Sequence, residues 1–390
     1  MKITSITARV CNAEMRNWVF VRVETDQAGL IGWGEATLEF KTRAIVGAIA
    51  DLEPMLLGED PRNIEHCFQI LTRHSFWRMG VIGMSAISGI EMALWDILGR
   101  SLGVPVWQLL GGSVREHLRT YTHLGLGDMR AVYESTTSNA IVELGKQVTE
   151  AGYDAVKIVC IPYSHYVTKA SDVDRVDRMV GDLRAVVGKD VDIMVDFHGR
   201  PASVNAAMDY IRAIADHRVM FAEEPVPPED LAGLAEITGR SPLPIAAGER
   251  LIGRREFEPA LKHRAFNIAQ PDICHTGGLW EAKKIAAMAE TAGIGLAPHN
   301  PLGPIAGVAA LHFGISTPNV IIQEEMSGAV PWYGDVVRWP IERRAGRWDK
   351  PSLPGLGIEV DESVIEAHPF APDILHARGA VLADGTVVDW

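Results

Sequence analysis

The sequence predicts an α/β protein in which a barrel of eight strand–helix units is joined to a smaller α+β domain. Over the middle of the 390-residue chain, short apolar runs end in polar residues and are followed by helix-like segments. This alternation predicts parallel strands joined by right-handed crossovers. The polar run ends from Asp196 to Glu324 recur every 23 to 27 residues, and eight such units close a barrel. An open doubly wound sheet would have a similar local pattern, but no Gly-rich GxGxxG segment follows the first run, so we favour the barrel.

The sequence pattern of the N-terminal third predicts strands followed by helices. Residues 1–35 carry apolar side chains near period two and a glycine-rich turn at Gly29–Gly34, which is typical of an antiparallel meander. From Thr42 to about Gly111 the apolar period becomes helical, most clearly over Met84–Leu98, and Gly103–Val104–Pro105 is a stop signal. This third is therefore expected to be α+β.

Eight apolar runs are the expected barrel strands. They are Thr120–Leu124, Ala155–Cys160, Asp192–Phe197, Val219–Glu224, Leu243–Glu249, Phe266–Asp272, Ile294–Asn300 and Val320–Glu325. The last part of the chain, Gly355–Trp390, is rich in Pro and Gly, and Asp384–Gly385 lies between two short apolar segments. This is a hairpin-like signal, and we expect the tail to return to the N-terminal domain.

Composition and charge exclude several classes of protein. The chain is 47% apolar and 22% charged, which is typical of a globular protein. Its net charge of -13 argues against nonspecific nucleic-acid binding, which needs clustered Lys and Arg. The four cysteines form no CxxC pair, and the N-terminus has no signal-peptide pattern, so we expect a reduced, cytoplasmic compartment. We expect no membrane partner, because no stretch of about 18 uninterrupted apolar residues occurs.

Three acids stand at the ends of successive predicted strands. Asp196, Glu223 and Glu249 would meet at the carboxyl face of the barrel, where barrel enzymes place their reacting groups. Three carboxylates together would repel one another unless a hard cation such as Mg²⁺ joined them. Alternatively, each acid caps a helix or forms a salt bridge. A zinc hydrolase is a further alternative, but such sites generally need several His ligands.

Two histidines are candidates for proton transfer. His198 follows Asp196 by two residues, so on an extended strand both would point into the barrel mouth. Asp272 ends one strand and His299 ends the next, and a carboxylate can orient an imidazole and raise its basicity. His299 is therefore the leading base. Either histidine could instead be a packed or surface residue.

Several segments together resemble the enolase superfamily, mandelate racemase subgroup, and most closely its galactonate-dehydratase-like sugar acid dehydratases. The segments are Val195–Arg200, Phe221–Pro225, Ala247–Arg250, Gln270–Asp272 with Gly277–Gly278, His299–Pro304, Met84–Gly112 and Asp389–Trp390. The resemblance covers nearly the whole chain. It implies a modified (β/α)7β TIM-like barrel over residues 119–350, an α+β capping domain over residues 1–118, and a C-terminal tail over residues 351–390.

The resemblance also implies roles for the site residues. The three strand-end acids would bind Mg²⁺ as the cofactor. Asp272 and His299 would form the base dyad, His198 would be the general acid, and Glu324 would hydrogen-bond the substrate carboxylate.

One departure from the family bears on the reaction. Racemases of this subgroup carry Lys-x-Lys at the end of the second strand, whereas this chain has Lys157–Ile158–Val159, so two-base racemisation through a second lysine is not expected. Lys157 could neutralise the substrate carboxylate, or it could be a surface lysine at the entry to a helix.

In the capping domain, Asn12–Trp18 and Phe40–Arg43 are candidates for substrate contacts. The predicted binding residues are Lys157, Glu324, Trp18 and Arg250.

The predicted function is dehydration of a sugar acid, either an aldonate or an aldarate. Removal of the proton α to the carboxylate and elimination of the β-hydroxyl would yield a 2-keto-3-deoxy acid. The expected partners are this small-molecule substrate and further copies of the chain in an even-numbered homo-oligomer. The alternatives are an epimerase or cycloisomerase on the same fold, and a metal-binding relative without turnover.

Overall fold

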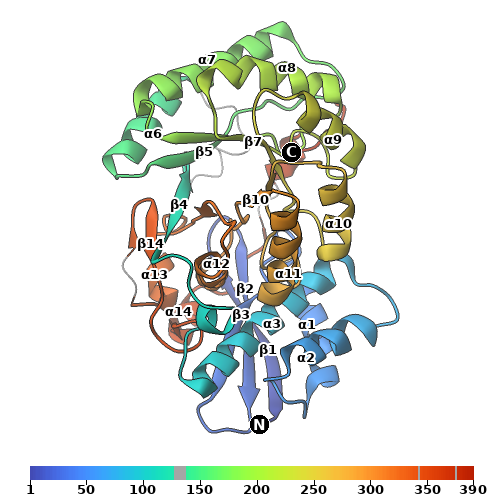
Figure 1. Cartoon of the computed structure of the whole chain (residues 1–390), viewed down its shortest axis with the longest axis vertical. Coiled ribbons are helices and arrows are strands. Elements are labelled where there is room, and N and C mark those ends of the chain that lie inside the picture. The colour runs from blue at the N-terminus through green and yellow to red at the C-terminus, as the bar shows by residue number, and fades with distance from the viewer. Residues whose placement is uncertain (127–137, 341–342, 374–375) are drawn as a thin grey trace.

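The computed structural model describes residues 1–126, 138–340, 343–373 and 376–390. Its N-terminal part is an antiparallel sheet in the order β1–β2–β3, followed by helices, as the change of apolar period predicts. The elements are β1 (Ile3–Asn12), β2 (Asn17–Thr25), β3 (Ile31–Glu35), α1 (Thr42–Leu56), α2 (Ile64–Arg73), α3 (Gly80–Leu102) and α4 (Val106–Leu109). In Figure 1 the strands and the helices α1 to α3 gather at one end of the molecule, where they form the predicted α+β capping domain.

The helix α3 is the centre of the capping domain. It packs directly on β3: a Cβ added to Gly34 would lie 1.9 Å from the carbonyl oxygen of Gly89, so these two backbones can approach only because both residues are glycine. The helix ends at the predicted stop signal, where Gly103 has a left-handed φ of 70°. By length and composition α3 could cross a membrane, but 78% of its most apolar window is buried inside the domain, so it has the position of a core helix.

Within the described residues, eight strands form the barrel. They are β4 (His117–His123), β5 (Ala155–Val159), β6 (Asp192–Asp196), β7 (Phe221–Glu223), β8 (Ile245–Ala247), β9 (Ile268–Ala269), β10 (Gly295–Leu296) and β11 (Gln323–Glu324). Successive strands from β4 to β10 pair in parallel. The strand β11 pairs with β4, and a parallel bridge joins Leu296 to Val320. The sheet therefore closes on itself, which confirms the predicted barrel and excludes the open sheet.

Helices connect these strands and cover the barrel. In the described parts of the chain they are α6 (Ser138–Glu150), α7 (Ala170–Val187), α8 (Val204–Ile214), α9 (Leu231–Arg240), α10 (Arg254–Lys262), α11 (Gly278–Thr291) and α12 (Pro304–Ile315), with the short 3-10 helix η1 (Ala215–His217) after α8. N-cap side chains fix where α8 and α9 begin: the Ser203 hydroxyl accepts a hydrogen bond from Ala206 N, and the Asp230 carboxylate accepts one from Gly233 N. This arrangement is the (β/α)7β pattern that the resemblance implies.

A layer of buried side chains fills the barrel below its mouth. Each strand or its flank contributes one member, and the layer consists of Tyr121, Ala155, Met194, Phe221, Ala246, Ile268, Ala297 and Ile322. Because side chains on a strand alternate with period two, the residue two positions later on the same strand lies one layer higher, on the same side. This rule brings polar side chains of β4, β5, β6, β7 and β11 together directly above an apolar floor.

The C-terminal part of the chain contacts both domains. Its elements are α13 (Tyr333–Val336), β12 (Val337–Arg338), β13 (Arg343–Arg344), β14 (Arg347–Asp349), β15 (Glu359–Val360), α14 (Glu362–Ala367) and η2 (His376–Gly379). The strand β14 pairs antiparallel with β4. Further on, Leu356 N donates to Asp96 at 2.8 Å and Asn17 donates to the Ala371 carbonyl at 2.8 Å, so the tail returns to the capping domain as expected.

The end of the tail continues beyond the capping domain to the barrel mouth. Val381 bridges antiparallel to Val387, which confirms the predicted turn around Asp384–Gly385. The Trp390 ring lies edge-on to the rings of Phe40 and His198, with centroids 5.6 and 6.0 Å apart. The domain limits at residues 118 and 350 stay predictions.

Candidate active site

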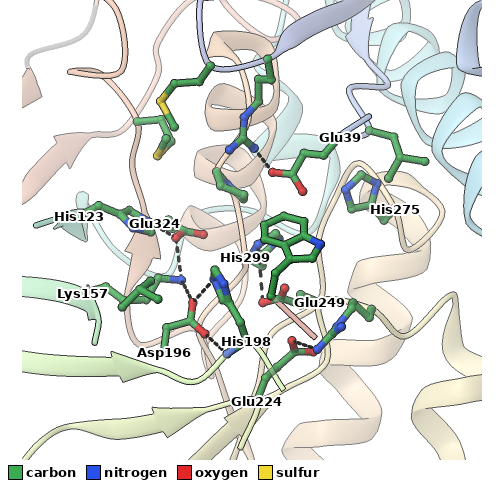
Figure 2. Close-up of a pocket in the computed structure, with 18 of the residues that line it drawn as sticks. Glu39, His123, Lys157, Asp196, His198, Glu224, Glu249, His275, His299 and Glu324 are labelled. Carbon is green, nitrogen blue, oxygen red and sulfur yellow. Dashed lines mark hydrogen bonds and ion pairs between the residues drawn. The ribbon is translucent and has the colours of Figure 1, made fainter. Parts of the chain in front are cut away.

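A cavity of about 510 Å³ lies between the capping domain and the mouth of the barrel. The capping domain lines it with Met15, Arg16, Leu38, Glu39 and Phe40, and the tail lines it with Asp389 and Trp390. The barrel side is mostly charged, and Figure 2 shows Lys157, Asp196, His198, Glu249, His299 and Glu324 pointing toward one another there. The cavity therefore combines an enclosing capping domain with a cluster of titratable groups, as expected of an active site.

Lys157 is the centre of the carboxylate cluster. Its ammonium nitrogen lies 2.8 Å from Glu324 Oε1, 3.0 Å from Glu223 Oε1 and 3.4 Å from Asp196 Oδ2. Burial acts to lower the pKa of Lys157, but the charges of Glu223 and Glu324 raise it well above its ordinary value. The lysine is therefore cationic and lines the cavity floor, so it is not the surface lysine of the alternative interpretation.

The buried acids carry more negative charge than Lys157 alone can offset. Burial and the neighbouring Asp196 carboxylate raise the pKa of Glu223 well above its ordinary value. Burial and the Glu224 carboxylate do the same for Glu249. Among the residues described, Glu223 Oε2 and Glu249 Oε2 are buried without a hydrogen-bond partner. Carboxylate oxygens that lack a hydrogen-bond donor, at the ends of neighbouring strands, are the ligand type that a hard divalent cation takes up.

The side chains are not arranged around a cation as they stand. Within the described ranges, no three His, Cys, Asp or Glu side chains form a group that could hold a metal ion. The ammonium of Lys157 instead bridges Asp196 and Glu223. The three predicted ligands thus fit Mg²⁺ by chemistry and by strand position, and side-chain rotation would be needed for all three to reach one ion.

The predicted dyad is brought together. His299 Nδ1 lies 2.7 Å from Asp272 Oδ2, and Asp272 is buried. Burial acts to lower the pKa of His299, but its hydrogen bond to the Asp272 carboxylate and the charge of Glu324 raise it to about 9. Because Nδ1 contacts the carboxylate, Nε2 is the nitrogen left to exchange a proton, and it lies 3.6 Å from Glu249 Oε2.

His198 reaches the cavity by a different route from the predicted one. The strand β6 ends at Asp196, and His198 has a left-handed φ of 52°, so the two side chains do not alternate along an extended strand. A turn brings them together instead: His198 N donates to Asp196 Oδ1 at 3.0 Å, and His198 Nε2 lies 3.2 Å from Asp196 Oδ2. A left-handed non-glycine residue is uncommon and costs free energy, and such residues concentrate at functional sites.

Glu324 lies among donors. Asn300 N donates to its Oε2 at 2.6 Å, and His123 Nε2 makes a short contact with its Oε1. Burial acts to raise the pKa of Glu324, but Lys157 and His123 hold it well below its ordinary value. These surroundings favour the ionised form, which accepts hydrogen bonds. A hydrogen bond from Glu324 to a substrate carboxylate would require a proton that its neighbours disfavour, and it stays a prediction.

Two predicted binding residues are placed differently from the rest. Arg250 lines the cavity, but its guanidinium forms a two-point contact with Glu224, at 3.0 and 2.6 Å. Trp18 does not line the cavity; it is 1% exposed and packs edge-on against Trp332 and Tyr333. The structure therefore does not bring Trp18 to the cavity, because its ring packs between the capping domain and the segment that follows the barrel.

The sequence interpretation missed several cavity residues. His123 ends β4, so the strand-end rule that selected Asp196 would have selected it as well. Arg16, within the predicted segment Asn12–Trp18, does line the cavity, but its ion-pair partner Glu39 and His275, in the loop after β9, were not predicted. No local pattern in the sequence marks Glu39 or His275 as a cavity residue.

Comparisons with known proteins agree with this architecture. Residues 4–111 match the mandelate racemase / muconate lactonizing enzyme N-terminal domain, and residues 140–364 match the enolase C-terminal domain-like family. D-galactonate dehydratases of Ralstonia nicotianae and Klebsiella pneumoniae are 40% and 37% identical, and in both cases 100% of each chain is covered.

Solved structures of related proteins have the same fold. A mandelate racemase/muconate lactonizing enzyme-like protein of a Roseovarius species superimposes with a TM-score of 0.89 at 32% identity, covering 96% of this chain and 97% of its own. A mandelate racemase/muconate lactonizing enzyme of a Jannaschia species gives 0.87 at 34% identity, covering 96% and 100%. This chain belongs to the enolase superfamily, with the domains of its mandelate racemase subgroup, and is galactonate-dehydratase-like over its whole length.

Proposed function

We propose that this protein is a Mg²⁺-dependent hydro-lyase that dehydrates a sugar acid, an aldonate or an aldarate, to a 2-keto-3-deoxy acid. The observation that carries the proposal is the meeting of an Asp–His dyad and a second histidine at one cavity, above a cluster of buried carboxylates. Relatives named D-galactonate dehydratase over the full chain length support the same reaction class.

His299 is the proposed base. A proton α to a carboxylate is a very weak acid, so its removal needs a positioned base and a stabilised product anion. Nε2 of His299 accepts the proton, while Asp272 holds Nδ1 and stabilises the imidazolium that forms. The pKa of about 9 for His299 applies while the negative charge of the neighbouring carboxylates is only partly neutralised by Lys157. Additional positive charge nearby would lower this pKa toward the value that a base needs at neutral pH.

His198 is the proposed acid for elimination. In its imidazolium form, His198 donates a proton to the β-hydroxyl, the carbon–oxygen bond breaks, and water leaves. The product is an enol that tautomerises to the 2-keto-3-deoxy acid. Asp196 Oδ2 lies 3.2 Å from His198 Nε2 and holds the ring at the cavity.

The cavity floor offsets the negative charge that develops on the substrate. Lys157 is cationic and lines the cavity, so it is placed to neutralise the substrate carboxylate. Asp196, Glu223 and Glu249 would hold Mg²⁺, which when bound supplies further positive charge for the ene-diolate. The same contacts argue against epimerisation with Lys157 as a second base, because three carboxylates keep its proton in place.

A library screen tests the proposal. Four-, five- and six-carbon aldonic and aldaric acids are incubated with the protein and Mg²⁺, and 2-keto acid is detected as its semicarbazone by absorbance. We expect at least one acid to react, and we expect both chelation and His299→Asn to abolish the signal. Exchange of the α-proton with solvent deuterium but no 2-keto acid from any substrate would favour an epimerase instead. No reaction of any kind would count against an enzyme of this class.

We also propose an even-numbered homo-oligomer. Phe76 and Trp77 are 88% and 80% exposed and lie against each other in the loop between α2 and α3, and exposed aromatic pairs are common at subunit interfaces. Light scattering at micromolar concentration measures the mass directly. A monomer mass would contradict this proposal and would leave the proposed reaction unaffected.

A further inference from the structure

A buried carboxylate of the capping domain caps the helix that follows the base loop. Glu35 ends β3, and its two oxygens accept hydrogen bonds from Gly303 N at 2.7 Å and from Ala306 N at 2.9 Å. Thr37 donates a third hydrogen bond to Glu35, at 2.7 Å. These N–H groups begin α12, which starts five residues after His299. A Cβ on Gly303 would lie 2.6 Å from Glu35 Oε1, so the glycine is what admits the carboxylate.

A second buried carboxylate caps the helix that follows the Asp272 loop. Glu91, in α3, accepts hydrogen bonds from Leu279 N at 2.8 Å and Trp280 N at 2.9 Å, at the start of α11. Ser88, one turn earlier in α3, accepts one from Gly277 N at 3.0 Å. A Cβ on Gly278 would lie 2.0 Å from Glu91 Oε2, so a glycine again admits the carboxylate.

The two carboxylates belong to one rigid unit. The elements that carry them, β3 and α3, touch backbone to backbone at Gly34 and Gly89. Both side chains are almost fully buried, at 0% for Glu35 and 2% for Glu91. Burying a carboxylate costs free energy, which the N–H groups and the dipole of a helix N-terminus offset. Figure 1 shows α11 and α12 reaching from the barrel toward the capping domain, where these contacts form.

We propose that Glu35 and Glu91 are positioning residues of the base dyad. Each holds one of the two barrel helices whose preceding loops carry His299 and Asp272, so together they maintain the 2.7 Å hydrogen bond between the two loops. The capping domain thus sets the geometry of the base as well as covering the cavity. The inference rests on the proposed function, because it concerns the group that removes the α-proton. A misplacement of about 1 Å in such a site can lower the rate by roughly a hundredfold.

The test compares Glu35→Gln and Glu91→Gln with a matched control, Asp96→Asn. Asp96 is also a fully buried carboxylate of α3 that accepts backbone hydrogen bonds, from Trp33 N at 3.1 Å and Leu356 N at 2.8 Å. Neither of those donors belongs to a dyad loop. All three variants replace one buried carboxyl group that accepts backbone hydrogen bonds, so all three are expected to lose stability, and only the first two are expected to displace the dyad.

Kinetics on the reactive sugar acid, with hydrogen or deuterium at the α-carbon, separate the two effects. For Glu35→Gln and Glu91→Gln we expect kcat to fall roughly 10- to 100-fold, with KM within about threefold and an isotope effect at least as large as that of the parent chain. For folded Asp96→Asn we expect kcat within about threefold of the parent value. A kcat loss no larger than that of Asp96→Asn, or a smaller isotope effect, would overturn the inference.

A substrate-free measurement keeps the inference separate from the proposed function. The Nδ1–H proton of His299, assigned by NMR from its loss in His299→Asn, should shift in both Gln variants and stay in place in Asp96→Asn. An unchanged resonance in both Gln variants would overturn the inference even if no substrate is found. If the Gln variants do not fold, Thr37→Val and Ser88→Ala remove one hydrogen bond each from the same contacts. Their kcat should fall about threefold to tenfold, and a parent-like kcat in both would equally overturn it.

Discussion

Replacing Asp272 by Asn tests the base dyad at its strongest contact. The substitution keeps the shape of the side chain and removes the charge that faces His299 Nδ1 at 2.7 Å. The pKa of His299 rises from 6.5 to about 9 although burial acts to lower it, and the hydrogen bond that the ring donates to Asp272 is the largest cause of the rise. That rise corresponds to roughly 3 kcal/mol in favour of the imidazolium, at about 1.36 kcal/mol per pKa unit. Without the carboxylate, burial remains, so the pKa should fall by at least about one unit.

Two measurements check this expectation. Histidine NMR on the metal-free protein follows the pKa of His299, with the resonance assigned by its absence in His299→Asn. The steady-state kcat/KM on the reactive sugar acid should fall by roughly 10²- to 10⁴-fold, the usual contribution of a positioned base. Asp216→Asn, an exposed position on the barrel surface, is the control. An unchanged His299 pKa together with kcat/KM within about threefold would refute the assignment of Asp272 as the partner that orients the base.

Three further predictions address the metal, the acid and the fold. Adding Mg²⁺ to chelated protein should raise the midpoint of thermal unfolding, because a ligand that binds only the folded state stabilises it, and Glu249→Gln should lose most of that rise in a calorimetric scan. His198→Asn should lower dehydration at least about a hundredfold while retaining exchange of the α-proton with deuterium, and loss of both would show that His198 does more than assist the leaving group. Burial lowers the pKa of His312 to about 4, below its unfolded value near 6.5. The neutral ring therefore contributes stability that is fully present above pH 6.5 and is lost as the pH falls toward 4. The loss is roughly 3 kcal/mol, and urea unfolding at pH 7 and pH 5 should show a smaller difference in His312→Gln than in the surface control His117→Gln.

The neutral His312 has a structural reason that the sequence does not reveal. Its Nδ1 accepts from Trp107 N at 3.0 Å, and its Nε2 lies 3.1 Å from the Leu356 carbonyl. One imidazole in α12 therefore joins the capping domain, the barrel and the tail. A protonated ring could not accept the bond from Trp107, which is why the buried site favours the neutral form.

The sequence by itself determined the barrel and the place of most of its polar groups. Parallel strands recur at the length of one strand–helix unit, and side chains on a strand alternate with period two. Both rules are local, so the order of residues was enough to predict that Asp196, Glu223 and Glu324 would meet at one end of the barrel. The pairing of Asp272 with His299 followed for the same reason, because adjacent strand ends are neighbours in any closed parallel barrel.

Only the tertiary structure decided how these groups are used. It inserted Lys157 among three carboxylates and brought His198 into the cavity by a left-handed turn. It also assigned Trp18 to the core and carried Glu35 to the start of α12, 268 residues further along the chain. Contacts between segments so far apart depend on how the capping domain packs on the barrel. That packing is fixed by the complementarity of whole buried surfaces, and no local period in the sequence encodes this complementarity.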